Sequence, residues 1–303
     1  MISTIVPTYA RPEHLRDCLE ALACQEHPRQ DYEVVVVDDG SPESPVTIVA
    51  DFERRMDVSL LVQENAGPAA ARNAGAARAR GALLAFTDDD CRPEPGWLAA
   101  LARAHAAAPD RLLGGTTDNA LADDLYAATS QMLIDHLYEY FNADPDDCRL
   151  FTSNNFAVPT GAFHELGGFA GEFPLAGGED RELCDRWVAS GRRMRFVPEA
   201  VVQHFHGMTL RAFARQHFGY GRGGYVFHRR RSGREPLRVE PLSFYAGLVA
   251  HPFRRRAAAG WRAVGATLLM LLSQVANVSG FFYEAWRQRR AKRALAAEPS
   301  GSR

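Results

Sequence analysis

The stretch VSLLVQENAGPAAARNAGAARARGALLAFTDDD, residues 58–90, contains a strand, a helix and a second strand in direct succession. The apolar run at 58–62 predicts the first strand, and the apolar run at 82–87 predicts the second. Between them, a Gly-Pro turn precedes an alanine-rich segment that predicts a helix over about 68–80. Two strands joined through a helix form a parallel pair, so this unit predicts a parallel α/β sheet.

The residues before this stretch repeat the alternation. MISTIVPTYARP at 1–12 predicts a short strand that proline ends, and RPEHLRDCLEALACQ at 11–25 has apolar residues at helical spacing. YEVVVVDDGSPESP at 32–45 has four consecutive valines, which is typical of a strand buried on both faces. We therefore expect an α/β fold with a doubly wound, mostly parallel sheet.

The loops that follow three of these strands carry the candidate chemistry. In doubly wound sheets, ligands bind beyond the carboxyl ends of the strands. PTYAR at 7–11, DDGS at 38–41 and TDDDC at 87–91 occupy those positions. The sequence therefore predicts five carboxylates along one rim of the sheet.

Three consecutive aspartates repel one another unless a cation or several donors stabilise them. Mg²⁺ or Mn²⁺, held by one or two carboxylates together with substrate phosphates, would remove that conflict. An exposed acidic turn is the alternative interpretation, but the position after a buried strand favours the metal. The spacing excludes an EF-hand, and no glycine-rich phosphate loop follows the first strand, which argues against NAD enzymes and P-loop proteins.

Three further groups of residues are candidates, each with a structural alternative. Arg72 lies near the start of the alanine-rich helix, where it could pair with a diphosphate or cover the acidic cluster. Glu179 and Asp180 begin a helix, so they could act as a general base or stabilise the helix dipole. His204 and His206 have the period of one strand face, within MRFVPEAVVQHFHG, which predicts a final pair of strands. They could be packed side chains or metal ligands.

Composition and charge divide the chain. The formal net charge is -2, but 17 basic and 33 acidic residues give -16 over residues 1–210, whereas 18 basic and 4 acidic residues give +14 over residues 211–303. The five cysteines form no CxxC pair, which favours a reducing cytoplasm over a disulfide framework. The N-terminus resembles no secretion signal, so we expect catalysis inside the cell.

Residues 2 to about 210 resemble a family 2 glycosyltransferase with the GT-A fold. The resemblance depends on six segments that occur in the family's order, namely IVPTYARPEHL, VVVVDDGS, ENAGPAAARNAG, FTDDDCRPEPGWL, GGFAGEFPLAGGEDRELCDRW and PEAVVQHFHG. The resemblance implies a catalytic domain over residues 1–210. It also implies a hexosyl-transferring enzyme that acts with Mn²⁺ or Mg²⁺.

The resemblance further implies roles for individual residues. The donor site would comprise Pro7, Thr8, Tyr9, Arg11, Asp39, Arg72, Asp88 and Asp89, with Asp39 binding the base and Asp88 facing the ribose. Asp90 would bind the metal together with His204 or His206, whereas Asp89 need contact neither ribose nor metal. Asp180 would deprotonate the acceptor hydroxyl, and Glu179 would support it. Asn154 and Asn155 would lie near the acceptor, and Ala10 departs from the asparagine frequent at its position.

The implied reaction moves a sugar from a nucleoside diphosphate sugar, most often a UDP-sugar in this family, to a glycan or lipid-linked acceptor. It is a single displacement with inversion. Two alternatives share the sheet. One is a catalytically silent sugar-nucleotide-binding or scaffold protein, and the other is a sugar-phosphate nucleotidylyltransferase, which would need a glycine-rich, basic first loop.

Residues 211–303 are expected to form a basic, partly apolar helical extension. The run at 263–283 holds no charge, Trp261 and Trp286 flank it, and basic runs at 254–256 and 287–293 lie outside it. This pattern is typical of a helix at the anionic cytoplasmic face of a membrane, which would make the protein peripheral there. A buried helix or a homo-oligomer interface is the alternative, and nucleic acid is not expected as a partner.

Overall fold

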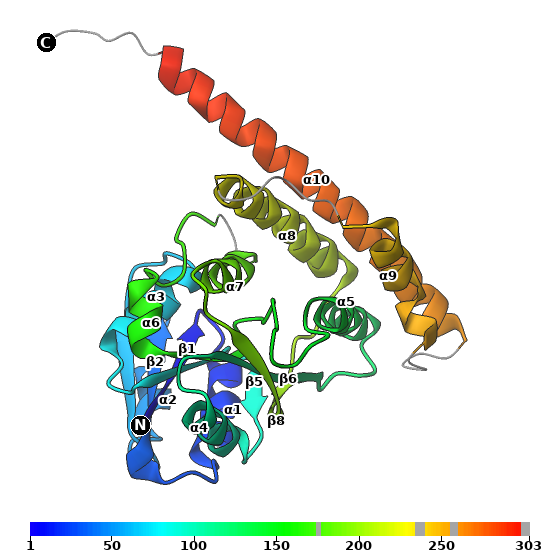
Figure 1. The fold of residues 1–303 in the computed structure, drawn as a ribbon. Coiled ribbons are helices and arrows are strands. Elements are labelled where there is room, and N and C mark those ends of the chain that lie inside the picture. Colours follow the sequence, from blue (N-terminus) through cyan, green and yellow to red (C-terminus); the bar gives the residue numbers. More distant parts are fainter. Residues whose placement is uncertain (174–176, 234–239, 255–259, 298–303) are drawn as a thin grey trace, which may run out of the picture. The chain divides into compact units, whose positions relative to one another are not determined.

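The computed structural model describes residues 1–173, 177–233, 240–254 and 260–297 (Figure 1). The chain forms two compact units. The first comprises Met1–Gly171 and Glu179–Gly207, and the second comprises Glu172–Gly178 and Met208–Arg303. Arg255 and Arg256, in one of the basic runs, lie outside the described residues.

The first unit is built on an eight-stranded mixed sheet with the order β3-β2-β1-β4-β7-β6-β8-β5. Its strands are β1 Ile2–Thr8, β2 Tyr32–Asp38, β3 Val58–Val62, β4 Leu83–Thr87, β5 Cys91–Pro93, β6 Leu112–Asn119, β7 Asn155–Pro159 and β8 Met194–His204. Among the described strands, only β7 and β5 run against the others. The prediction of a doubly wound, mostly parallel α/β sheet is therefore confirmed.

The helices of the first unit cover both faces of this sheet (Figure 1). They are α1 Pro12–Ala23, α2 Val46–Ala50, α3 Pro68–Arg78, α4 Trp97–Ala107, α5 Leu125–Phe141, α6 Thr160–Glu165 and α7 Glu179–Ala189, with a 3-10 turn η1 at Arg29–Asp31. The consecutive valines of β2 show why both faces need cover. Val34 and Val36 pack in the apolar cluster with α1 and α4, whereas Val35 and Val37 pack in the cluster with α3 and α7.

The small residues of α3 let this helix approach the sheet closely. A Cβ atom on Gly75 would lie 2.5 Å from Ile5 Cγ2 and 2.9 Å from Val37 Cγ2, so a larger residue would push the helix away. The beginning of α3 is thereby held close to the ends of β1 and β2. This places Arg72 at the rim.

One expectation about the strands is wrong. The segment 194–206 was expected to form a pair of strands, but residues 194–204 form the single strand β8. Its pairing with β6 shifts between Gly115 and Thr116, where Val197 and Val201 are the successive partners. Pro198 cannot donate a ladder hydrogen bond, so the chain bulges at this point instead of turning back.

The described residues of the second unit form three helices, α8 Leu210–Arg231, α9 Leu242–Arg254 and α10 Trp261–Ala297. The packing of α8 against α10 depends on glycine. A Cβ atom on Gly280 would lie 2.0 Å from the carbonyl oxygen of Phe218, and one on Gly221 would lie 1.9 Å from that of Asn277. The two backbones therefore touch. The prediction of a helical C-terminal region is confirmed.

Candidate active site at the carboxyl rim of the sheet

The sheet topology brings the predicted acids to one edge. Thr8 pairs with Asp38 at the ends of β1 and β2, and Thr87 pairs with Asn155 where β4 ends and β7 begins. Cys91 at the start of β5 pairs with His204 at the end of β8. The three loops that follow β1, β2 and β4 therefore share a rim with the end of β8.

Asp89 points into the protein. It is buried, accepts a hydrogen bond from Thr8 Oγ1 at 2.7 Å and forms an ion pair with Arg11 Nη2 at 2.5 Å. Burial raises the pKa of Asp89 to about 7, despite the neighbouring guanidinium. Partial protonation near neutral pH relieves the repulsion among the three adjacent acids.

Asp90 lies among cationic and imidazole groups. Arg11 Nη1 donates to its Oδ2 at 2.8 Å, His206 Nδ1 lies 3.3 Å from the same oxygen, and His204 Nε2 lies 3.5 Å from Oδ1. Burial opposes ionisation of Asp90, but the hydrogen bonds to His204 and His206 outweigh it and hold its pKa well below the usual value. Asp90 is therefore an anion.

The two histidine rings stack with centroids 5.2 Å apart and planes inclined by 8°. β8 ends at His204, so His206 follows the strand instead of lying on its face as expected. The backbone nitrogen of Phe205 donates to the carbonyl oxygen of Asp90 at 2.8 Å, which keeps this segment beside Asp90.

These residues fit a divalent cation. One carboxylate oxygen of Asp90 and one nitrogen from each of His204 and His206 lie within 4.8 Å of one another. Carboxylate oxygen suits both Mg²⁺ and Mn²⁺, whereas imidazole is typical of the later transition metals. The donor set therefore identifies a divalent-cation site without selecting Mn²⁺ over Mg²⁺.

Arg72, in α3, forms an ion pair with Glu179, in α7, which lies 107 residues later in the sequence. Its buried guanidinium donates to Asp88 Oδ1 at 2.6 Å and to Glu179 Oε1 at 3.2 Å. It also lies over the ring of Phe169, 5.7 Å from the centroid. This position is compatible with both interpretations of Arg72. The side chain covers the acidic cluster, and it also lies at the rim, where it could pair with a diphosphate.

Asp180 follows Glu179 in the first turn of α7. Its Oδ1 accepts the backbone N–H of Arg181 at 2.7 Å, and the backbone of Ser153 also bonds to it. Burial, followed by the charge of Glu179, raises the pKa of Asp180 to about 6. A carboxylate with such a pKa can accept a proton at neutral pH.

Asp39, which directly follows β2, binds the loop that precedes α3. Its two oxygens accept Gln63 Nε2 at 2.7 Å and the backbone N–H groups of Ala66 and Gly67 at 2.9 and 2.8 Å. The sequence analysis did not predict a role for Gln63. Its position directly after β3, at the same rim, is the feature that could have indicated one.

The first loop contains an unusual backbone conformation. Ala10 has a φ of 52°, a value that residues other than glycine rarely adopt and that asparagine, aspartate and histidine adopt more often than the rest. Its N–H donates to Ser41 Oγ at 2.8 Å. Asparagine, which the resemblance leads us to expect at this position, tolerates this region better than alanine does. Pro7 lies in β1 and Tyr9 is exposed beside it.

The expectation that Asn155 lies near an acceptor is wrong. Asn155 is fully buried, accepts from Trp97 Nε1 at 2.8 Å and donates to the carbonyl oxygens of Thr116 and Ala200. Its amide therefore links strands within the core. Asn154 is partly exposed and accepts from Thr152 Oγ1.

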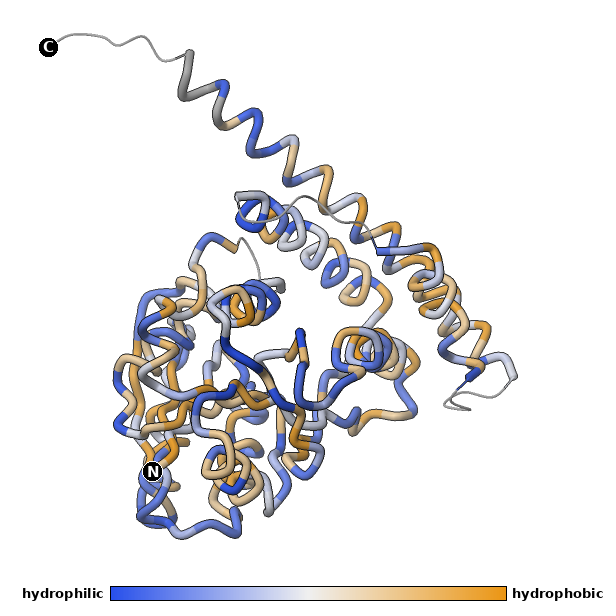
Figure 2. The backbone as a smooth tube through the Cα atoms, viewed as in Figure 1, coloured by the Kyte–Doolittle hydropathy of each residue, from blue (hydrophilic) through white to orange (hydrophobic). Residues whose placement is uncertain are grey.

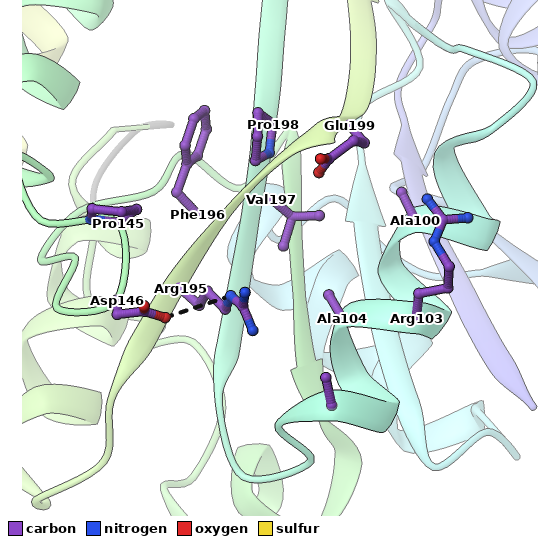
Figure 3. Close-up of a pocket in the computed structure, with 11 residues that line it drawn as sticks. Ala100, Arg103, Ala104, Pro145, Asp146, Arg195, Phe196, Val197, Pro198 and Glu199 are labelled. Carbon is purple, nitrogen blue, oxygen red and sulfur yellow. Dashed lines mark ion pairs between the residues drawn. The ribbon is translucent and has the colours of Figure 1, made fainter.

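A separate hollow of about 440 Å³ lies beside the bulge of β8 (Figure 3). Arg103 of α4 and Arg195, Pro198 and Glu199 of β8 line it, and Arg195 pairs with Asp146 at 3.5 Å. None of the predicted site residues lines it. It is distinct from the rim.

Solved structures with similar folds are glycosyltransferases. A mannosyltransferase from Pyrobaculum calidifontis in complex with GDP-Man and Mn²⁺ has a TM-score of 0.67 at 18% identity, covering 94% of this chain and 87% of that one. S. aureus TarS 1–349 in complex with UDP-GlcNAc has a TM-score of 0.55 at 16% identity, covering 95% and 91%. The fold is the GT-A fold.

The sequence comparisons agree. A validoxylamine A glucosyltransferase from Streptomyces hygroscopicus subsp. jinggangensis is 31% identical over 228 residues, covering 66% of this chain and 54% of that protein. The chain spans 33% to 54% of the length of the first curated relatives that it matches. The model of glycosyl transferase family 2 matches residues 3–167, which is more than half of the chain. This chain therefore belongs to glycosyl transferase family 2.

Proposed function

We propose that this protein transfers a sugar from a nucleoside diphosphate sugar to an acceptor hydroxyl with inversion at the anomeric carbon. The observation that carries the proposal is the bridge through Arg72. It links Asp88, in the predicted donor site, to Glu179, which precedes the predicted base Asp180. A donor and an acceptor bound at this rim would meet between these groups.

Asp90, His204 and His206 would hold the divalent cation, which would neutralise the developing charge of the leaving diphosphate. The residues of the first loop and Asp39 would bind the nucleotide base, with Asp39 already oriented by Gln63. Asp88 would face the ribose, held in place by Arg72.

Asp180 would accept the proton of the acceptor hydroxyl. Its raised pKa, about 6, combines a deprotonated form at neutral pH with appreciable basicity. Glu179 would support it through charge and through its ion pair with Arg72. The activated oxygen would then attack the anomeric carbon from the side opposite the diphosphate, which inverts the configuration.

We favour a UDP-sugar as donor and a glycan or lipid-linked acceptor. The proteins of similar fold bind GDP-Man in one case and UDP-GlcNAc in the other, so likeness of fold leaves the nucleotide open. We place the reaction in the cytoplasm, and the five free cysteines are compatible with its reducing environment.

The alternative functions are less well supported. A sugar-phosphate nucleotidylyltransferase would need a glycine-rich, basic first loop, and PTYARPEH at 7–14 is neither. A buried carboxylate with a raised pKa at the rim favours a catalytic role for Asp180 over a silent binding or scaffold protein.

The deciding experiment is a thermal-shift screen of UDP-, GDP- and dTDP-sugars with and without Mn²⁺, with the full chain. We expect one nucleotide class to raise Tm only when Mn²⁺ is present. The stabilising donor is then offered with acceptors, and NMR identifies the anomeric configuration of the product. No stabilisation by any donor, or retention of configuration, would contradict the proposal.

A further inference from the structure

Helix α10 of the second unit has a buried face and an exposed apolar face. Its inner face is buried within the unit, as the burial of Ala266, Met270, Ser273 and Glu284 shows. Its outer face, named here the α10 stripe, exposes eight large apolar side chains by between 46% and 72%. The α10 stripe consists of Trp261, Val264, Leu268, Leu271, Val275, Val278, Phe282 and Trp286.

The spacing of the α10 stripe makes it one continuous surface. Successive members lie three or four residues apart from Trp261 to Trp286, so they line one side of the helix. This surface extends over about 38 Å of helix, and contiguous exposed apolar patches of this kind often mark an interaction site. In Figure 2, orange turns along α10 give way to blue turns near its C-terminal end. We therefore expect the α10 stripe to bind a partner.

The residues around the α10 stripe favour a lipid surface. A tryptophan stands at each end, where indole rings prefer the boundary between headgroups and acyl chains. Arg289, Arg290 and Arg293 follow on exposed positions of the same helix. Its only acid in the described part, Glu284, is buried and paired with Arg222 and Arg287. The exposed charges on this helix are therefore positive.

A second copy of the chain fits the α10 stripe poorly, although the spacing would suit a coiled coil. Coiled coils select partners by opposite charges beside the seam, and residues 263–283 contain no charge at all. A parallel pair would bring the arginines at 287–293 together, and an antiparallel pair would bring them towards Arg262 and Arg254. Both arrangements are repulsive.

By length and composition, Trp261–Ala291 could also cross a membrane, with 28% of its most apolar window buried. The inner face argues for a surface position instead, because α8 packs against it at Asn277 and Gly280, near the middle of that segment. A spanning α10 would carry α8, with Arg222 and its partner Glu284, into the hydrocarbon region or lose this packing, and either is costly.

We infer that the α10 stripe binds an anionic lipid bilayer, with α10 lying in the plane of the headgroups and the apolar side chains inserted beneath them. Arg289, Arg290 and Arg293 contact the lipid phosphates. This surface is independent of the proposed sugar transfer.

The test is flotation of the full chain with preformed vesicles of phosphatidylglycerol and phosphatidylcholine, compared with vesicles of phosphatidylcholine alone. We expect binding to the anionic vesicles that weakens in 0.5 M NaCl. Leu268→Glu with Val275→Glu should lower the binding at least about tenfold, because two inserted apolar side chains become charged. Val46→Glu with Val62→Glu, exposed apolar residues of the first unit that add the same charge, is the matched control and should bind normally.

Tryptophan emission gives a second readout. Trp97 and Trp187 are fully buried, so only Trp261 and Trp286 should shift to the blue when anionic vesicles are added. Three outcomes would overturn the inference. These are no flotation, resistance of the bound protein to extraction at pH 11, which marks a spanning helix, and a lipid-free dimer that the Leu268→Glu, Val275→Glu variant abolishes.

Discussion

The carboxyl rim of the first unit buries charged groups, whereas the α10 stripe of the second unit exposes apolar ones. Asp89, Asp90, Arg72 and Glu179 are all buried, yet each has an oppositely charged or hydrogen-bonding partner. The side chains of the α10 stripe are exposed, although contact between apolar groups and water is unfavourable. Each region inverts the usual distribution of polar and apolar residues.

The two inversions point to different kinds of ligand. Buried charges that are held in place before the substrate binds can recognise a charged substrate. They can also stabilise the charge that develops during the reaction. An uncovered apolar surface with positive charges beside it favours an extended anionic surface. Variants at the two regions should therefore fail in different assays, and within each region one variant should be far more harmful than its matched control.

The largest effect is expected for Asp180→Asn. An amide cannot accept the acceptor's proton, so kcat should fall by about 10²–10⁴-fold while the Kd of the donor changes little. Steady-state kinetics and calorimetric donor binding measure the two quantities. Asp185→Asn, the same substitution on the same helix, is the control and should keep its activity. If Asp180→Asn keeps kcat within tenfold of the parent, the base lies elsewhere.

The next effect separates two neighbouring acids. Asp90→Asn removes the anionic ligand beside His204 and His206, and we expect at least about a 100-fold loss of Mn²⁺-dependent activity with weaker Mn²⁺ binding in calorimetry. Asp89→Asn should cost less than tenfold, because Asp89 points into the protein towards Thr8 and is not one of the three residues proposed to hold the metal. Equal losses from both variants would contradict the division of roles.

A smaller effect is expected from pH. Asp180 must be deprotonated to act as base, and its pKa is about 6, so kcat should rise with pH through about 6 and level off above it. At pH 5 the rate should be about tenfold below its value at pH 7. The pH profile of the Asp185→Asn control should show the same rise. A profile flat between pH 5 and 7 would exclude Asp180 as the titrating group.

The smallest effect concerns the inner face of α10. A methyl group at Gly280 would meet the backbone of α8, so Gly280→Ala should lower the free energy of unfolding by about 2 kcal/mol. Gly224→Ala is the control, because no atom lies within 4 Å of the added methyl group, and it should stabilise by up to about 1 kcal/mol. Chemical denaturation measures both. If Gly280→Ala is neutral, the inner face is loose and α10 could turn the α10 stripe inwards.

Local patterns in the sequence were enough to predict the α/β sheet, the rim acids and the C-terminal helices. The four consecutive valines of β2 and the alanines of α3 each predict a single element, a strand or a helix. Packing between elements does not change such a local prediction. The same reasoning failed where packing intervened. Pro198 produced a bulge rather than a turn, and Asn155 turned inwards to bond Trp97.

Contacts between distant residues depended on the folded chain. The pairing of β5 with β8 brings Asp90 to His206 across 116 residues, and the approach of α3 to the sheet places Arg72 between Asp88 and Glu179. In α10, the charge-free run 263–283 has apolar residues on more than one side, and the packing of Gly280 against α8 determines which side is left exposed. Periodicity identifies the faces of an element, but which of them meet is fixed by packing between elements far apart in the chain.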